Sequence, residues 1–341
     1  MNSCRYHQAV RLRFANQSGL TLVELMISMT LGLVVVMAAT ALLLSTKSGY
    51  AVQDESARIQ DTGRYAIESI ARAVRQAAYE DWRTDDVPIL STGDISANIE
   101  GLDAKSLKKI TAGIESPQSD AVNGSDVLAV RFFGSGIGKH GDGTIINCAG
   151  FGVRAATSQA TAESERGWSI FYVRTGTDGE PGLYCKWKKD AEPGAGGDDS
   201  WTAESIARGV ESFQVLYGLD LNADSLPDRF VSATAINAMD DAFVAAAGAA
   251  ENPVDKNKIT NWKKVVTVKV ALLLRGSQPT REGTPNLVYD LFGKDYADAN
   301  ATTDIGTRIK EMALPNSIRN RARKAFAMSI QLRNQAAGSG A

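Results

Sequence analysis

The sequence predicts an α+β fold, in which one long N-terminal α-helix packs on a C-terminal β-rich globular head. Three observations predict it. Residues 25–46 form an apolar run without a single charged residue. The segment that follows is amphipathic at helical spacing, and the first proline in the chain is Pro88. Farther along, short runs of branched aliphatic and aromatic residues alternate with turns rich in glycine and aspartate, a pattern typical of β-strands.

The apolar run is a predicted membrane segment. A helix of this length, rising about 1.5 Å per residue, crosses the roughly 30 Å hydrocarbon core of a bilayer. Residues 1–19 carry Arg5, Arg11 and Arg13 and no acidic residue. The positive-inside rule therefore keeps this end in the cytoplasm and sends everything after Thr46 across the membrane. A secretory signal peptide is the alternative, but no clear small-x-small cleavage site closes the run.

The helix is predicted to continue from Ser45 to about Trp82. Gly49 and Gly63 each cost roughly 1 kcal/mol relative to alanine, so they mark the places where a bend is expected. On the exposed side, Asp54 and Arg58 stand four residues apart, as do Glu68 and Arg72. One face of the second half is apolar and is predicted to pack on the head: Ile67, Ile70, Val74, Ala77 and Ala78.

The head is predicted to be built mainly from strands. The runs with strand character are residues 127–133, 169–174, 183–187, 210–218, 264–275 and 324–333. Residues 175–182 predict the loop of a hairpin, and the alanine-rich residues 233–250 predict a helix. Irregular, loop-rich segments are expected at 87–125 and 276–313, with polar linkers at 191–200 and 252–261.

Two of the three cysteines, Cys148 and Cys185, follow the membrane segment, whereas Cys4 precedes it. Beyond the membrane the compartment is oxidising, so Cys148 and Cys185 are expected to form a disulfide. Closing a loop of nearly forty residues stabilises the fold by roughly 4 kcal/mol in the loop-entropy description. Two buried free thiols are the alternative.

A short aspartate-rich stretch follows the strand at 210–218. Oxygen-bearing side chains stand at alternate positions, as in the first half of a calcium loop. Ser225 replaces the glycine of the sharp turn, and Val231 stands where the closing glutamate belongs. An Asx-rich turn accounts for this pattern. The alternative is calcium or another hard cation, bound by Asp220, Asn222, Asp224 and Asp228.

The start of the helix carries a recognisable signal, Ser18-Gly19-Leu20-Thr21-Leu22-Val23-Glu24-Leu25. It resembles the class III signal of type IV prepilins, in which a peptidase cuts after the glycine and the fifth mature residue is glutamate. The resemblance implies cleavage between Gly19 and Leu20 and N-methylation of Leu20. An acid such as Glu24 is costly at the edge of an apolar layer unless it is compensated, and the Leu20 amino group of a neighbouring subunit has the opposite charge. Glu24 is therefore predicted to be an assembly contact; a solvated glutamate at the headgroup level is the alternative.

Further segments narrow the resemblance to PilW-type minor pilins of type IV pilus systems. They are Gln-Asp-x-Gly-Arg-Tyr-Ala-Ile-Glu at 60–68, Val-x-Tyr-Gly-x-Asp at 215–220, Val-Lys-Val-x-Leu-Leu-Leu-Arg at 268–275 and Arg-Lys-Ala-Phe-x-x-x-Ile-x-Leu-Arg-Asn at 323–334. Two features depart from the usual pattern: the first mature residue is leucine, and the membrane helix lacks the proline of many major pilins.

The resemblance implies a low-abundance subunit that primes filament assembly at or near the pilus tip, and so contributes to twitching motility and adhesion. The expected partners are other minor pilins, the major pilin, the prepilin peptidase and the assembly platform of the inner membrane. The protein would begin as a single-pass inner-membrane protein with its head in the periplasm. The expected division is a leader at 1–19, a membrane or filament-core helix at 20–46, its amphipathic continuation at 47–86 and a pilin-like head at 87–341.

Composition limits the other functions. Lysine and arginine (37) nearly balance aspartate and glutamate (39), so no basic field for nucleic acid is expected. His7 lies in the leader, and His140 alone cannot make a two-histidine metal site. We expect no enzymatic activity and no cofactor other than the calcium considered above, because no nucleophile, base and third group stand at recognisable spacing. The alternatives are a J-like minor pseudopilin of a type II secretion system and a membrane-anchored, adhesin-like binding module.

Overall fold

The computed structural model of the protein describes residues 19–79, 95–189, 200–246, 256–281, 283 and 286–333. It confirms the predicted α+β fold, with a long apolar N-terminal helix followed by a β-rich region. The chain divides between Val52 and Gln53 into two units, and all the strands that the structure describes belong to the second unit. Of the predicted leader, residues 1–18 lie outside the described part of the chain.

Helix α1 runs without interruption from Leu22 to Gln76, so neither Gly49 nor Gly63 breaks it. Its first part contains a stretch that is long and apolar enough to cross a membrane, and no residue of that stretch is buried. The helix ends earlier than the predicted Trp82. Ala78 adopts a left-handed φ of 57°, which a right-handed helix does not accommodate, and the carbonyl of the next residue accepts a hydrogen bond from the Phe133 amide.

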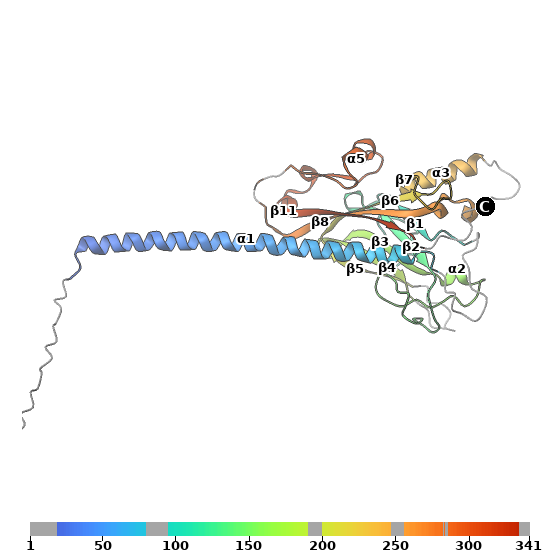
Figure 1. Ribbon diagram of the computed structural model, residues 1–341, viewed down its shortest axis with the longest axis horizontal. Helices are drawn as coiled ribbons and strands as arrows, with labels where there is room; N and C mark the ends of the chain where they lie inside the picture. Colours follow the sequence, from blue (N-terminus) through green and yellow to red (C-terminus); the bar gives the residue numbers. More distant parts are fainter. Residues whose placement is uncertain are drawn as a thin grey trace, which may run out of the picture. The chain divides into compact units, whose positions relative to one another are not determined.

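The second unit is built around two antiparallel sheets (Figure 1). The five-stranded sheet has the order β1-β2-β3-β4-β5, made by β1 (Ile99–Leu102), β2 (Val127–Phe132), β3 (Gly167–Thr175), β4 (Pro181–Lys188) and β5 (Trp201–Arg208). The four-stranded sheet has the order β11-β8-β6-β7, made by β6 (Val210–Leu219), β7 (Arg229–Val231), β8 (Val265–Pro279) and β11 (Arg321–Gln331). A separate ladder pairs β9 (Val288–Asp290) with β10 (Arg308–Lys310).

Short helices connect the strands. The α-helices after α1 are α2 (Ala162–Glu165), α3 (Ala233–Ala246), α4 (Lys256–Ile259), α5 (Lys294–Asn300) and α6 (Asn316–Arg319). Single 3₁₀ turns occur at η1 (Val122–Gly124), η2 (Asn261–Lys264) and η3 (Glu311–Ala313). Helix α3 confirms the helix predicted in the alanine-rich segment.

One hydrophobic core joins both large sheets to the C-terminal part of α1, and in Figure 1 strands of both sheets lie alongside that part of the helix. Phe171 of β3, Phe213 of β6 and Leu272 of β8 are fully buried in this core. Burying a side chain of this size stabilises a fold by roughly 1.5–3 kcal/mol. The apolar face predicted for the helix is confirmed for Ile67, Ile70 and Val74, which are buried on α1. Ala77 and Ala78 are also buried, but they follow the end of the helix.

The chain passes from one sheet to the other at Gly209, between β5 and β6. Its φ of +76° lies in the left-handed region that favours glycine. Its amide donates to the Pro181 carbonyl, and its carbonyl accepts from the Arg275 amide at 2.8 Å. A Cβ at this position would lie 2.6 Å from the Arg275 carbonyl oxygen, so the backbones approach too closely for any other residue.

Each predicted strand is present, as β2, β3, β4, β6, β8 and β11, and β3 and β4 form the predicted hairpin. The loop predictions need correction. Strand β5 was not predicted, because its sequence lacks clean alternation and its pairing with β4 contains a bulge beside Tyr184. The region 87–125 contains β1, and the region 276–313 contains β9, α5 and β10 as well as the end of β8. These short elements depend on tertiary pairing rather than on local propensity.

Gly63 marks a close approach between α1 and β11, and this gives a testable prediction. A Cβ there would overlap the Phe326 ring, whereas nothing lies within 4 Å of a Cβ at Gly49. Alanine at either position gains about 1 kcal/mol of helix propensity, but at Gly63 overpacking costs about 1–3 kcal/mol. We expect Gly63→Ala to melt at a lower temperature than the matched variant Gly49→Ala. Equal melting of the two variants would contradict this packing, and Phe326→Leu should restore part of the loss.

Candidate functional site

The first turn of α1 holds Glu24 in a capping box. The Glu24 carboxylate accepts hydrogen bonds from the Thr21 amide and the Thr21 hydroxyl, each at 3.0 Å. The Thr21 hydroxyl oxygen accepts one in return from the Glu24 amide, at 3.3 Å. This reciprocal pattern satisfies amides that a helix N-terminus otherwise leaves unpaired, and it places the carboxylate at the positive end of the helix dipole. In the single chain, Glu24 is therefore held by its own helix.

Gly19 and Leu20, the residues of the predicted cleavage site, are exposed and immediately precede this turn. Every residue of α1 from Leu22 to Val52 is exposed as well. Cleavage between Gly19 and Leu20, methylation of Leu20 and the assembly role of Glu24 stay predictions. The local geometry is compatible with them, because cleavage would leave the new amino group one residue before the Thr21 cap.

Within the second unit, a buried carboxylate fixes α1 to the end of β8. Glu55 is buried, and it accepts hydrogen bonds from the amide of Ser277 and, at 3.3 Å, from the amide of Gln278. The Ser277 hydroxyl donates to the same carboxylate at 3.3 Å. Hydrogen bonds to a buried charged group cost about 1–3 kcal/mol or more to break, so Glu55 sets the register of the helix against the sheet.

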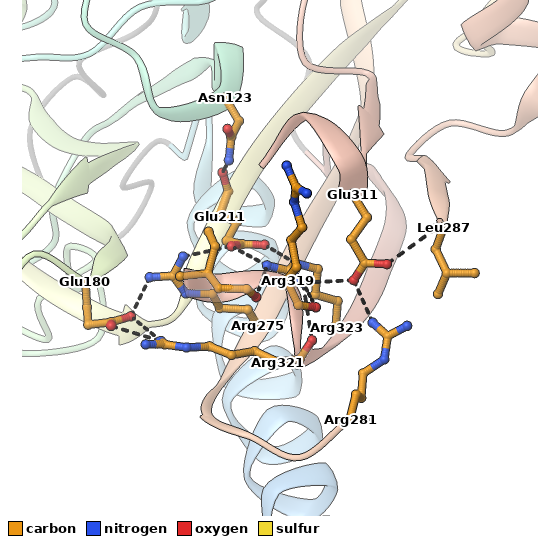
Figure 2. Close-up of polar contacts among 11 residues, drawn as sticks. Asn123, Glu180, Glu211, Arg275, Arg281, Leu287, Glu311, Arg319, Arg321 and Arg323 are labelled. Atoms are coloured by element: carbon orange, nitrogen blue, oxygen red, sulfur yellow. Dashed lines mark hydrogen bonds and ion pairs between the residues drawn. The ribbon is translucent and has the colours of Figure 1, made fainter. Parts of the chain in front are cut away.

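A set of charged side chains that is buried at its centre, which we call the Arg–Glu network, ties the four-stranded sheet to its surrounding turns (Figure 2). Arg323 of β11 lies at its centre, 2.6 Å from Glu211 of β6 and 3.0 Å from Glu311 of η3. These three side chains are at most 1% exposed. The other members are Glu180, Arg275, Arg281 and Arg321.

The outer members extend the Arg–Glu network in both directions. Arg275 joins Glu211 to Glu180, at 2.8 and 2.6 Å, and Arg321 also binds Glu180, at 2.9 Å. Arg281 binds Glu311 at 2.7 Å. Partial burial opposes ionisation of Glu180, but its hydrogen bonds from Arg275 and Arg321 outweigh that cost and lower its pKa. The ion pairs thus join segments of the chain that are remote in sequence.

Sequence reasoning missed this network because its partners are remote in the chain: Glu180 and Arg321 are 141 residues apart. One signal was available. Arg321 and Arg323 stand two residues apart, a spacing that places side chains on one face of a regular strand. The predicted strand began only at residue 324, and the pairing of β11 is irregular between the two arginines.

The predicted disulfide is confirmed. Cys148 and Cys185 are bonded, with their Cα atoms 5.8 Å apart, and both residues are buried. Cys185 lies on β4, whereas Cys148 belongs to the connection between β2 and β3. The bond therefore holds that connection, which also contains the exposed His140, against the five-stranded sheet.

The predicted calcium residues lie together in an exposed loop between β6 and β7. Asp220 accepts hydrogen bonds from the amides of Ala223 and Ser225, at 2.6 and 2.8 Å, and Asp228 accepts one from the Leu221 amide at 2.7 Å. Asn222 donates to both Asp224 and Asp228. These bonds make an Asx-rich turn, which accounts for the pattern of residues without an ion. Calcium at Asp220, Asn222, Asp224 and Asp228 stays a prediction.

Two protein families match the chain. Residues 14–40 match the prokaryotic N-terminal methylation motif, and residues 170–334 match type IV pilus-assembly protein W. The second match covers just under half of the chain. These matches support a type IV minor pilin. The first match contains Gly19, Leu20 and Glu24, and the second contains the whole four-stranded sheet and the whole Arg–Glu network of this pilin.

No curated protein sequence matches this pilin. Among solved structures, it is similar to a type IV-like pilin from Thermus thermophilus, with 14% sequence identity and a TM-score of 0.33 over 82% of this chain and 99% of the other. The family is one of structural pilus-assembly proteins and not a known enzyme family. The two matches support a pilus-related role, in which the protein interacts with other pilus components.

The Arg–Glu network should respond strongly to loss of its central arginine. Arg323→Ala leaves Glu211 and Glu311 buried without their shared partner, and breaking a buried pair in this way costs roughly 3–5 kcal/mol. The matched control is Arg58→Ala, which removes an exposed pair with Asp54 and should cost under about 1 kcal/mol. Chemical unfolding of the purified proteins measures both changes. Similar stability of the two variants would show that the Arg–Glu network contributes nothing beyond a surface ion pair.

Proposed function

We propose that this pilin is a minor subunit that primes assembly of the type IV pilus and is incorporated at or near the filament tip. The observation that carries the proposal is the start of α1: an exposed Gly19–Leu20 bond, a carboxylate in the next turn, and an apolar helix surface exposed from Leu22 to Val52. The match of residues 14–40 to the methylation motif supports the same processing.

Assembly is proposed to begin with cleavage after Gly19, which creates a positively charged amino group on Leu20. This amino group and the Glu24 carboxylate of a neighbouring subunit attract each other, and the attraction is strong in a layer of low dielectric constant. The hydrogen bonds from Thr21 hold Glu24 until a neighbour arrives. The exposed apolar side chains of the two helices then pack against each other.

The proposed location is the inner membrane, with one membrane-spanning helix and the head in the periplasm, followed by incorporation into the pilus. The arginines before α1 and the disulfide in the head support this orientation, because a disulfide persists in an oxidising compartment. The proposed partners are the prepilin peptidase, the inner-membrane assembly platform, other minor pilins and the major pilin. Contributions to twitching motility and adhesion would follow from the pilus itself.

The decisive variants separate the charge of Glu24 from its capping role. Glutamine also serves at the third helical position of a capping box, so Glu24→Gln keeps the cap and loses the charge. Thr21→Ala removes the cap hydroxyl and keeps the charge. We expect Glu24→Gln and Glu24→Ala to be inserted and cleaved but absent from sheared pili, and Thr21→Ala to be incorporated. Immunoblots of sheared pili and of membranes measure both steps.

Two results would contradict the proposal. Normal incorporation of Glu24→Gln would exclude charge pairing as the assembly contact. Absence of the unmodified protein from sheared pili, with retention in a secretion complex, would instead indicate a J-like minor pseudopilin. Copurification of the cleaved protein with other minor pilins is the result expected for a priming subunit.

A further inference from the structure

Three aspartates from distant parts of the chain meet inside the head. Asp103 follows β1, Asp126 precedes β2, and Asp304 lies between α5 and β10. One carboxylate oxygen from each lies within 4.8 Å of the others. Asp126 and Asp304 are buried, with 1% and 4% exposure, and Asp103 is half-buried. This cluster is separate from the aspartate-rich loop between β6 and β7.

The aspartate cluster differs from the Arg–Glu network in its charge balance. The buried Glu211 and Glu311 each bind at least one arginine. Among the residues that the structure describes, by contrast, neither Asp126 nor Asp304 forms an ion pair, and Asp103 forms none either. Like charges at this separation repel strongly in a medium of low dielectric constant, and buried charges normally require a compensating charge.

Uncharged groups donate hydrogen bonds to the three carboxylates, but they do not supply a compensating positive charge. Asp103 accepts from the amides of Ala233 and Thr234 at the start of α3, at 3.0 and 2.7 Å. Asp126 accepts from the amides of Ala104 and Val215, at 3.0 and 2.9 Å. These hydrogen bonds orient oxygens toward one another, so the backbone itself builds the cluster.

Two buried polar atoms at the cluster lack a hydrogen-bond partner among the described residues. One Asp304 oxygen accepts from the Tyr296 hydroxyl at 2.8 Å, but the other, Oδ1, is unpartnered. The hydroxyl of Tyr217, which is fully buried and lies against Gly101, is also unpartnered. Leaving such atoms unsatisfied costs free energy, so they indicate a further group at this position.

We infer that Asp103, Asp126 and Asp304 bind one divalent cation, calcium, inside the head. Carboxylate oxygens are the ligands that hard cations prefer. Calcium–oxygen bonds of about 2.3–2.6 Å put ligands on opposite sides of the ion about 4.6–5.2 Å apart, which accommodates the spread of this cluster. Magnesium, with bonds of about 2.0–2.1 Å, requires a tighter set.

Bound calcium would connect three segments: the turn after β1, the start of β2 and the segment between α5 and β10. Burial raises the pKa of Asp126 well above its usual range and that of Asp304 to about 6, and the charge of Asp103 adds to both increases. A cation offsets both effects by stabilising the ionised carboxylates.

Calcium titration of the full-length protein in detergent tests this inference. After treatment with EDTA, the unmodified protein should bind calcium in a calorimetric titration and melt at a higher temperature when calcium is present. Asp304→Asn should lose both responses, because it removes one ligand charge. Asp224→Asn is the matched control in the exposed loop, and it should keep both responses.

The melting temperatures of the variants also show whether a loss of calcium binding results from unfolding. In EDTA, Asp304→Asn should melt at or above the temperature of the unmodified protein, since it removes a repelling charge and its amide oxygen still accepts from Tyr296. Asp103→Asn, at the half-buried member, should show the same loss of calcium binding. The inference is overturned if the unmodified protein binds no calcium, if both cluster variants bind it normally, or if only Asp224→Asn abolishes binding.

Discussion

Arg323 is shared by two buried glutamates, and the arrangement of the four-stranded sheet depends on this contact. A guanidinium with no exposed surface has lost its hydration, so its charge must be balanced by the carboxylates of Glu211 and Glu311. Glu211 lies at the start of β6, and Glu311 lies after β10. The strand that carries Arg323 therefore pairs along β8 and also holds the segment of residues 286–313 to the sheet.

Helix α1 packs on the same strand, β11. Gly63 approaches the Phe326 ring on β11, and Glu55 caps amides at the end of β8. Both contacts act on the four-stranded sheet, whereas the apolar face of the helix packs in the core shared with the five-stranded sheet. The second part of α1 is thus specified by a glycine, a buried carboxylate and an apolar stripe. Its first part, from Leu22 to Val52, has no buried residue, and its apolar side chains are exposed.

Much of the fold could be predicted from the sequence, because long apolar or alternating runs report burial directly. The Val265–Leu274 run and the helix face around Ile70 are examples. Elements without such a pattern were missed. β5 has an irregular burial order, and β9 and β10 have three residues each and exist through their mutual pairing. The processing site could be predicted because it is a contiguous motif. The Arg–Glu network and the aspartate cluster could not, because residues such as Glu180 and Arg321 meet only after folding.

Compensation of buried or desolvated carboxylates connects the parts of this pilin that matter for its proposed role. Glu211 and Glu311 receive arginines from their own chain, so they stabilise the head independently of any partner. Glu24 receives only the Thr21 donors, which satisfy hydrogen bonds but leave the charge unbalanced. In water, the solvent stabilises the charge of this carboxylate. In an apolar layer it does not, and a positive group from outside the chain lowers the free energy of the ionised carboxylate. An incompletely compensated carboxylate thus favours association, and a fully compensated one favours folding. The aspartates around Asp304 resemble Glu24 in this respect, since none of the three forms an ion pair with a described residue.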